Sequence, residues 1–258
     1  MGRQNPSKPV GAKETVAMRL FVKFFVVIVA IFIGASAGFY YWLTYYNGDL
    51  GDVSSFAQFS PANQATAIDS CSGTSITVVP PNAFGKYLLN AITTAEDFDP
   101  SATTLNTVLQ AASDVRSHHS LPLQLARLLI CNPGKSLDHQ FKAIRLAIRL
   151  ERKFTDEQLL TIYLNRVYFG QELYGVSAAS QAYFGRTPDK LSLAESATLA
   201  VLIRQPNFYL NHPDKLLPRR NEALEKMTSA GKITQEELKM AEQEPVQNLN
   251  GAANKEVR

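Results

Sequence analysis

The residues best suited to chemistry in this sequence are basic, and they recur along one stretch of the chain. Cations stand at positions i, i+3, i+7 and i+10, which places four of them on one face of a helix: Lys142, Arg145, Arg149 and Arg152. Such a face can bind phosphate groups, because several positive charges act on one anion. A plain solvated face, or one lying against anionic lipid headgroups, explains Arg149 and Arg152 equally well.

An acidic pair, Glu96 and Asp97, ends an apolar segment upstream of these cations. A carboxylate in this position could act as a general base and take the proton from an attacking hydroxyl group. Taken alone, an acidic pair at the end of a helix is more typical of a solvated terminus, and Asp97 before Asp99-Pro100 is also typical of a turn. The pair therefore needs independent support before it is assigned a catalytic role.

Composition limits the classes of function. The chain has 258 residues, with 26 Lys and Arg against 23 Asp and Glu and a net charge of +3, which suits an anchor plus one domain of ordinary size. This mild basicity fits an anionic lipid or phosphate ligand and argues against a nucleic-acid partner. The sequence has no C-x-x-C motif and its four histidines are scattered, so no metal site is predicted. Whether Cys71 and Cys131 pair is open.

One segment near the N-terminus is apolar enough to cross a membrane. Residues 24–43 carry no charge, and a helix of that length rises about 30 Å. Five cations and one acid precede it in residues 1–23, and aromatic residues follow, so we expect a cytoplasmic tail and an exported C-terminal part. A cleaved signal peptide is the alternative, because Ala35-Ser36-Ala37 forms an A-x-A site, but the apolar run continues past it and favours an anchor.

Beyond the anchor the pattern predicts a mostly helical domain. Residues 44–83 are rich in Ser, Gly, Asp and Pro and indicate a periplasmic stem with one short strand at 75–79. Residues 84–246 show helical periodicity, and 247–258 indicate a disordered tail. The helices are expected at 87–95, 105–112, 121–130, 137–152, 156–163, 191–203, 218–230 and 234–244.

Two long segments carry a family resemblance. YLNRVYFGQELYGVSAASQAYFG at 163–185 is similar to the fourth signature block of the peptidoglycan glycosyltransferases, as found in class A penicillin-binding proteins and monofunctional transglycosylases. LSLAESATLAVLIRQPNFY at 191–209 is similar to the fifth block, and LERKFTDEQLL at 150–160 fits the same family. The resemblance covers roughly 84–246 and implies a lysozyme-like, all-α domain that polymerises glycan strands from lipid II.

The resemblance also implies roles for individual residues. The family's general base is the Glu of an E-D-x-x-F-x-x-H-x-G block, which corresponds to Glu96 here. Cations that stabilise the departing undecaprenyl pyrophosphate correspond to Arg127 and Lys135, with Lys142 near them. The remaining residues expected to bind substrate are Ser120, Gln124 and Asn165. No cofactor is indicated, apart from a divalent cation that could assist at the pyrophosphate.

Three departures from the family pattern fall in the catalytic blocks. The first block lacks about eight residues, with its His and Gly, after Asp97. The second block reads HHSLPLQLAR and has lost most of its hydroxyl and amide groups. In the third block, R-K-x-x-E in the family, the second glutamate has become Ala143. Glu172, which stands where the family often has Gly, is a candidate to replace it.

These departures leave two functions open. The first is a glycosyltransferase acting on lipid II with weakened or lost catalysis. The second is a non-catalytic subunit that binds lipid II or another cell-wall synthase through the same fold. Either would sit in the bacterial cytoplasmic membrane as a single-pass protein, with its helical domain on the periplasmic or extracellular side.

Overall fold

The computed structural model describes residues 11–45, 53–59, 65–68, 75–96, 98, 104, 120–130, 137–245 and 249. The chain divides into two compact units, Met1–Gly48 and Asp49–Arg258. The expected helix at 105–112 and the cysteines at 71 and 131 lie outside the described residues.

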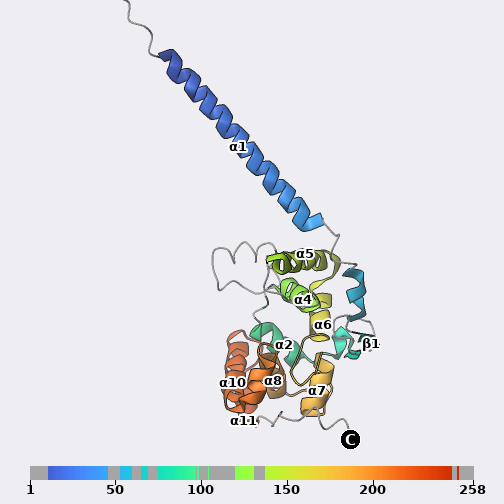
Figure 1. Ribbon diagram of the computed structural model, residues 1–258. Coiled ribbons are helices and arrows are strands. Elements are labelled where there is room, and N and C mark those ends of the chain that lie inside the picture. Colours follow the sequence, from blue (N-terminus) through green and yellow to red (C-terminus); the bar gives the residue numbers. More distant parts are fainter. Residues whose placement is uncertain are drawn as a thin grey trace, which may run out of the picture. The chain divides into compact units, whose positions relative to one another are not determined.

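The first unit contains one long helix, α1 (Gly11–Tyr45) (Figure 1). Its segment Lys23–Trp42 has 20 residues, a mean hydropathy of 2.1 and side chains that are mostly exposed. It is the one helix among the described residues that is long and apolar enough to cross a bilayer.

The second unit is mainly helical, which confirms the all-α fold class. Its first elements are η1 (Val53–Phe59), strands β1 (Ala65–Ile68) and β2 (Ser75–Val78), and η2 (Pro81–Ala83). The helices that follow are α2 (Lys86–Ala95), α4 (Leu121–Leu129), α5 (Leu137–Lys153), α6 (Asp156–Leu164), α7 (Val176–Phe184), η3 (Pro188–Lys190), α8 (Leu193–Leu202), α9 (Pro206–Asn211), α10 (Pro213–Ser229) and α11 (Gln235–Gln243).

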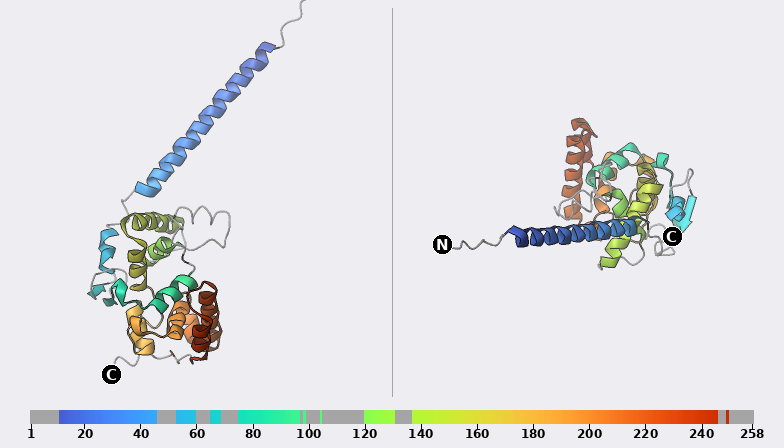
Figure 2. Two further views of the ribbon diagram at one scale, coloured as in Figure 1. Left: turned by 180° about the vertical axis from the view of Figure 1, so that it is seen from behind. Right: turned by 90° about the horizontal axis from the view of Figure 1, so that it is seen from above.

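The helices of this unit form two groups (Figures 1 and 2). Helices α4 and α5 pack against each other in one group, and α2, α8 and α10 pack together in the other, with α11 against α8 and α10. Helix α6 contacts α4 and α5 and runs between the groups. The C-terminal ends of α2 and α8 are therefore held near the end of α6, where the candidate site lies.

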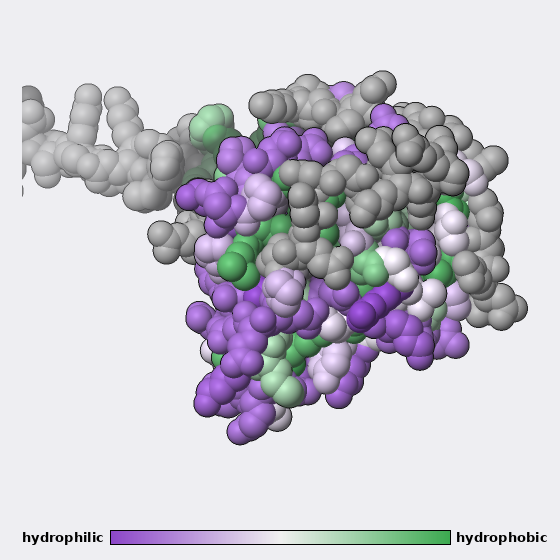
Figure 3. All heavy atoms as spheres, turned by 90° about the horizontal axis from the view of Figure 1, so that it is seen from below, coloured by the Kyte–Doolittle hydropathy of each residue, from purple (hydrophilic) through white to green (hydrophobic). Residues whose placement is uncertain are grey.

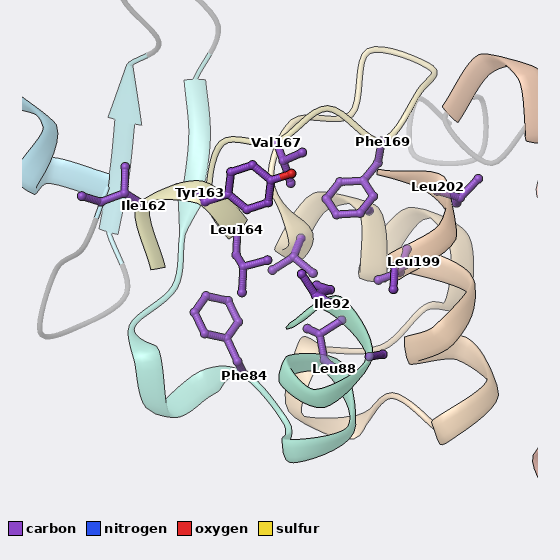
Figure 4. Close-up of a cluster of buried hydrophobic side chains, with 14 of the residues drawn as sticks. Phe84, Leu88, Ile92, Ile162, Tyr163, Leu164, Val167, Phe169, Leu199 and Leu202 are labelled. Carbon is purple, nitrogen blue, oxygen red and sulfur yellow. The ribbon is translucent and has the colours of Figure 1, made fainter. Parts of the chain in front are cut away.

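Helix α8 is the centre of the core. All ten of its residues are buried, as expected for a helix that is apolar on every side and surrounded by others. Figure 4 shows Leu199 and Leu202 of α8 in one cluster with Leu88 and Ile92 of α2 and with side chains from α6 and the segment after it. On the face drawn in Figure 3, by contrast, hydrophilic residues predominate and the hydrophobic ones form small patches.

Several elements differ from the expectations. Helices α7 and α9 were not expected: α7 consists largely of small residues, which give a weak apolar pattern, and α9 has only six residues. Helix α10 begins at Pro213 and continues through Pro218, where the sequence predicted its start. A proline also fits the first turn of a helix, so the earlier Pro213 takes that position.

The segment expected as a stem contributes to the domain core. Val53 and Phe59 of η1 are buried, and so are Ile76 and Val78 of β2, which pairs antiparallel with β1. At the other end, Leu249, within the expected disordered tail, is 4% exposed, and its carbonyl accepts a hydrogen bond from Gln171 Nε2 at 3.1 Å. The packed part of the chain thus extends beyond 84–246 on both sides.

Candidate active site

Glu96 stands at the C-terminal end of α2, where its backbone N–H donates to Ile92 O at 2.9 Å. The residue is 4% exposed, and its Oε1 lies 3.3 Å from Nε of Arg204. Arg204 follows α8, 108 residues further along the chain. Because α2 and α8 pack side by side, their C-terminal ends bring an acid and a base together in one place.

Tyr163, at the end of α6, lies beside this ion pair. Its hydroxyl donates a long hydrogen bond, 3.5 Å, to Gln124 Oε1 of α4. Burial, and secondly the negative charge of Glu96, raise the pKa of the Tyr163 hydroxyl well above its ordinary value. The phenol is therefore neutral at physiological pH and available as a hydrogen-bond donor. Phe98 packs edge-on against the ring, with the ring centroids 5.7 Å apart.

Ala143, which the sequence pattern aligns with the family's second glutamate, is buried. Ala143 lies in α5 and is 4% exposed, among the buried residues of that helix. Glu172 is exposed in the tight turn that follows Gly170, with a φ of 61°. The described residues thus give the site one buried carboxylate, Glu96, where the family pattern has two.

The candidate phosphate-binding cations differ in their surroundings. Arg127, in the last turn of α4, is exposed and accessible to an anion. Lys142 pairs with Asp138 Oδ2 at 2.7 Å, one helical turn away, and lowers the pKa of that carboxyl group below its ordinary value. Lys135 lies outside the described residues.

The interpretation of α5 as carrying four cations on one face needs correction at Arg145. This residue is 2% exposed, whereas Arg152 is exposed. The four positions do share one side of the helix, but Arg145 lies in its middle among buried residues, whereas Arg152 lies in its last turn. Helix α5 therefore does not present a continuous basic stripe to solvent.

Ser120 and Asn165 have contacts that the sequence did not indicate. Ser120 is the N-cap of α4, and its side chain accepts a hydrogen bond from Leu123 N at 3.2 Å. Asn165 is fully buried, and its Nδ2 donates to Phe59 O at 3.0 Å and to Val79 O at 2.8 Å. Its Oδ1 accepts from Val79 N at 2.9 Å. These bonds join the end of α6 to η1 and to the end of β2.

A glycine makes this junction possible. Gly175 has a φ of +81°, and a Cβ atom there would lie 2.6 Å from Asn165 O. A side chain would therefore clash with the backbone, in a region of φ that L-residues rarely adopt. The fourth signature block thus specifies the packing around Asn165.

No group of three or more His, Cys, Asp or Glu residues within the described ranges is arranged to hold a metal ion.

Sequence reasoning identified neither Arg204 nor Tyr163 as a site residue. The available signal for Arg204 was weak, a single cation directly after a ten-residue apolar helix. The importance of both residues follows from their position around Glu96, which only the packing of α2, α6 and α8 establishes.

Comparisons with known proteins identify the family of the chain. A family model described as "Transglycosylase" matches residues 64–228. Penicillin-binding protein 1A of Aquifex aeolicus is 34% identical over 173 residues, which cover 62% of this chain and 24% of that protein. The Escherichia coli protein of the same name is 39% identical over 125 residues, covering 48% of this chain and 15% of the relative.

Longer alignments are also found. Penicillin-binding protein 1A of Rickettsia prowazekii is 30% identical over 252 residues, covering 88% of this chain and 31% of that protein. A crystal structure of penicillin-binding protein 1A from Haemophilus influenzae matches with a TM-score of 0.34 and 27% identity over 50% of this chain and 16% of its own. The chain therefore spans less than a third of the length of these relatives.

Proposed function

The chain belongs to the transglycosylase family, and from this premise we propose that it binds lipid II at the membrane surface with polymerising activity that is strongly reduced or lost. The family reaction joins an acceptor sugar hydroxyl to a donor sugar, and undecaprenyl pyrophosphate leaves. It needs a carboxylate to take the hydroxyl proton and positive groups to stabilise the leaving pyrophosphate.

The burial of Ala143 is the observation that carries the proposal. The alanine side chain at that position is apolar and 4% exposed, so it contributes no charge to the reaction. Loss of one general acid or base typically reduces a rate by about 10² to 10⁴. Glu96 is left as the candidate base, paired with Arg204 and beside Tyr163.

Substrate binding depends on other residues. Arg127 is exposed on α4 and, with Lys135 and Lys142, is expected to meet the pyrophosphate; Gln124 lies nearby on the same helix. Binding without turnover, as a subunit that presents lipid II to another cell-wall synthase, is the second candidate, and the same burial of Ala143 favours it.

Membrane attachment by α1 completes the proposal. The apolar segment Lys23–Trp42 would span the cytoplasmic membrane once, with the N-terminus inside and the helical domain outside. An attached domain meets a lipid-linked substrate within the same membrane surface.

Polymerisation of purified lipid II by the full-length protein in detergent tests this function. We expect the wild type to be at least about 100-fold slower than penicillin-binding protein 1A of Escherichia coli measured beside it. Glu96→Gln should abolish any residual activity, because glutamine keeps the shape of the side chain but cannot accept the proton.

The matched variants Ala143→Glu and Ala143→Gln test whether the absence of a carboxylate at position 143 limits the rate. If the missing carboxylate limits the rate, the glutamate variant should gain at least about tenfold over the glutamine variant, with circular dichroism confirming that both are folded. A wild-type rate equal to that of the Escherichia coli protein would contradict the proposal.

A further inference from the structure

Two buried glutamates in this domain each form an ion pair with an arginine, but only one of them also caps a helix. Glu96 pairs with Arg204 and Glu195 pairs with Arg186, each at 3.3 Å, and both glutamate side chains are 5% exposed. Glu195 also belongs to the capping box of α8, where its Oε2 accepts from Ser192 N at 2.8 Å. Among the described residues, the Glu96 carboxylate has Arg204 as its one hydrogen-bond partner. The Glu96 side chain therefore takes no part in capping a helix.

The two members of the Glu96–Arg204 pair differ in accessibility. The Arg204 side chain is 42% exposed, so a dissolved anion can reach the guanidinium group while Glu96 remains covered. An ion pair that is open on the side of its cation can exchange partners, because a second anion competes with the carboxylate for the same N–H donors.

The surroundings of Arg204 favour an anion. A small cavity of about 20 Å³ beside it is also lined by Arg219, Lys226, Tyr209 and Glu222. Counting Glu96, three cations stand against two carboxylates here, with Arg204 paired to Glu96 and Arg219 to Glu222, so Lys226 leaves the region one net positive charge. The cavity has room for little more than a water molecule, so a phosphate group would bind at its mouth, against the exposed face of Arg204.

We propose that Arg204 is a positioning residue that exchanges between Glu96 and the phosphate oxygens of a bound pyrophosphate. Without an anion, Arg204 covers and neutralises Glu96. With an anion bound, the guanidinium turns to the phosphate oxygens and the carboxylate is released toward the substrate. This inference rests on the proposed function, since it takes the anion to be the pyrophosphate of the lipid substrate.

Isothermal titration of the full-length protein in detergent with inorganic pyrophosphate tests the exchange. We expect Glu96→Gln to bind pyrophosphate three- to tenfold more tightly than the wild type, because Arg204 no longer has a competing carboxylate. Arg204→Gln should bind at least threefold more weakly. Combined with Arg204→Gln, the Glu96→Gln change should have no further effect, because the residue through which it acts is gone.

Glu195→Gln is the matched control. This substitution also removes the carboxylate that pairs with a half-exposed arginine, here Arg186. The distance in that ion pair equals the distance between Arg204 and Glu96, but Arg186 does not line the small cavity beside Arg204. Its pyrophosphate affinity should equal that of the wild type, which would show that an unpaired arginine alone does not create a site.

Two outcomes would overturn the exchange. If Glu96→Gln tightens binding equally in the Arg204→Gln background, the carboxylate merely repels the anion. If all variants bind pyrophosphate with the same affinity, or if none binds it, Arg204 does not contact the anion. Neither result bears on the lipid II polymerisation measurement, so failure of the exchange can be distinguished from failure of the proposed function.

Discussion

At the scale of single residues, the polar groups around the site divide into those that hold the backbone and those that can meet a ligand. Asn165 belongs to the first kind, because three hydrogen bonds tie its enclosed amide to the backbone of Phe59 and Val79. Arg127 and Arg204 belong to the second kind, because both are accessible to solvent. Substitutions of the two kinds should therefore affect different measurements.

Replacement of Asn165 by alanine should lower stability. It leaves up to three buried backbone groups without partners, at about 1 to 3 kcal/mol each, so we expect the free energy of unfolding to fall by about 3 kcal/mol or more. Thermal unfolding in detergent, followed by circular dichroism, measures the change. Asn207→Ala, at an exposed position, is the control and should change stability by less than about 0.5 kcal/mol. Equal melting temperatures for the two variants would contradict this structural role of Asn165.

At the scale of elements, α8 determines where the site lies. Its N-terminus is fixed by a capping box in which Ser192 and Glu195 satisfy each other's backbone N–H groups. The Ser192 hydroxyl also donates to Glu244 Oε1 at 2.8 Å, which fixes the end of α11 against this cap. With its start fixed and all its sides buried, α8 places Arg204 opposite the end of α2.

Truncation of a side chain in α8 should therefore destabilise the whole domain. Leu199 is 0% exposed, and Leu199→Ala should cost about 2 to 5 kcal/mol, because it leaves a cavity in the core. The same substitution at Leu217, which is 41% exposed on α10, is the matched control and should cost less than about 1 kcal/mol. Urea unfolding in detergent measures both; similar losses would mean that α8 is not the central core helix.

At the scale of the whole molecule, the chain combines an apolar helix with a domain that is largely polar on the face drawn in Figure 3. The excess of cations in residues 1–23, ahead of the apolar segment, predicts that the N-terminus stays in the cytoplasm. The aromatic residues at the end of the apolar segment, such as Tyr41 and Trp42, would lie in the headgroup region on the outer side.

Cysteine labelling in cells with an intact cytoplasmic membrane tests this topology. In a background in which serine replaces Cys71 and Cys131, a cysteine at Ser229 should react with a membrane-impermeant maleimide. A cysteine at Ser7 should react only after permeabilisation. The reverse pattern would contradict the orientation, and labelling of both sites in intact cells would contradict a single spanning helix.

The sequence by itself determined the helical class of the domain, most helix positions and the family, because apolar periodicity and signature blocks are local properties of the chain. It also predicted Glu96 as the candidate base and aligned Ala143 with a carboxylate of the family pattern. It did not predict β1, α7 or α9, because short elements and small residues give little periodic signal.

Only the tertiary structure decided which of these residues meet. Glu96 and Arg204 are 108 residues apart, and nothing in the spacing of either residue indicates the other. The pair forms because α2 and α8 pack in a way that aligns their C-terminal ends. The enclosure of Asn165 and the burial of Arg145 have the same origin, since a side chain's exposure depends on neighbours from distant parts of the sequence. Local patterns thus specify the elements, whereas the chemistry around Glu96 depends on long-range packing.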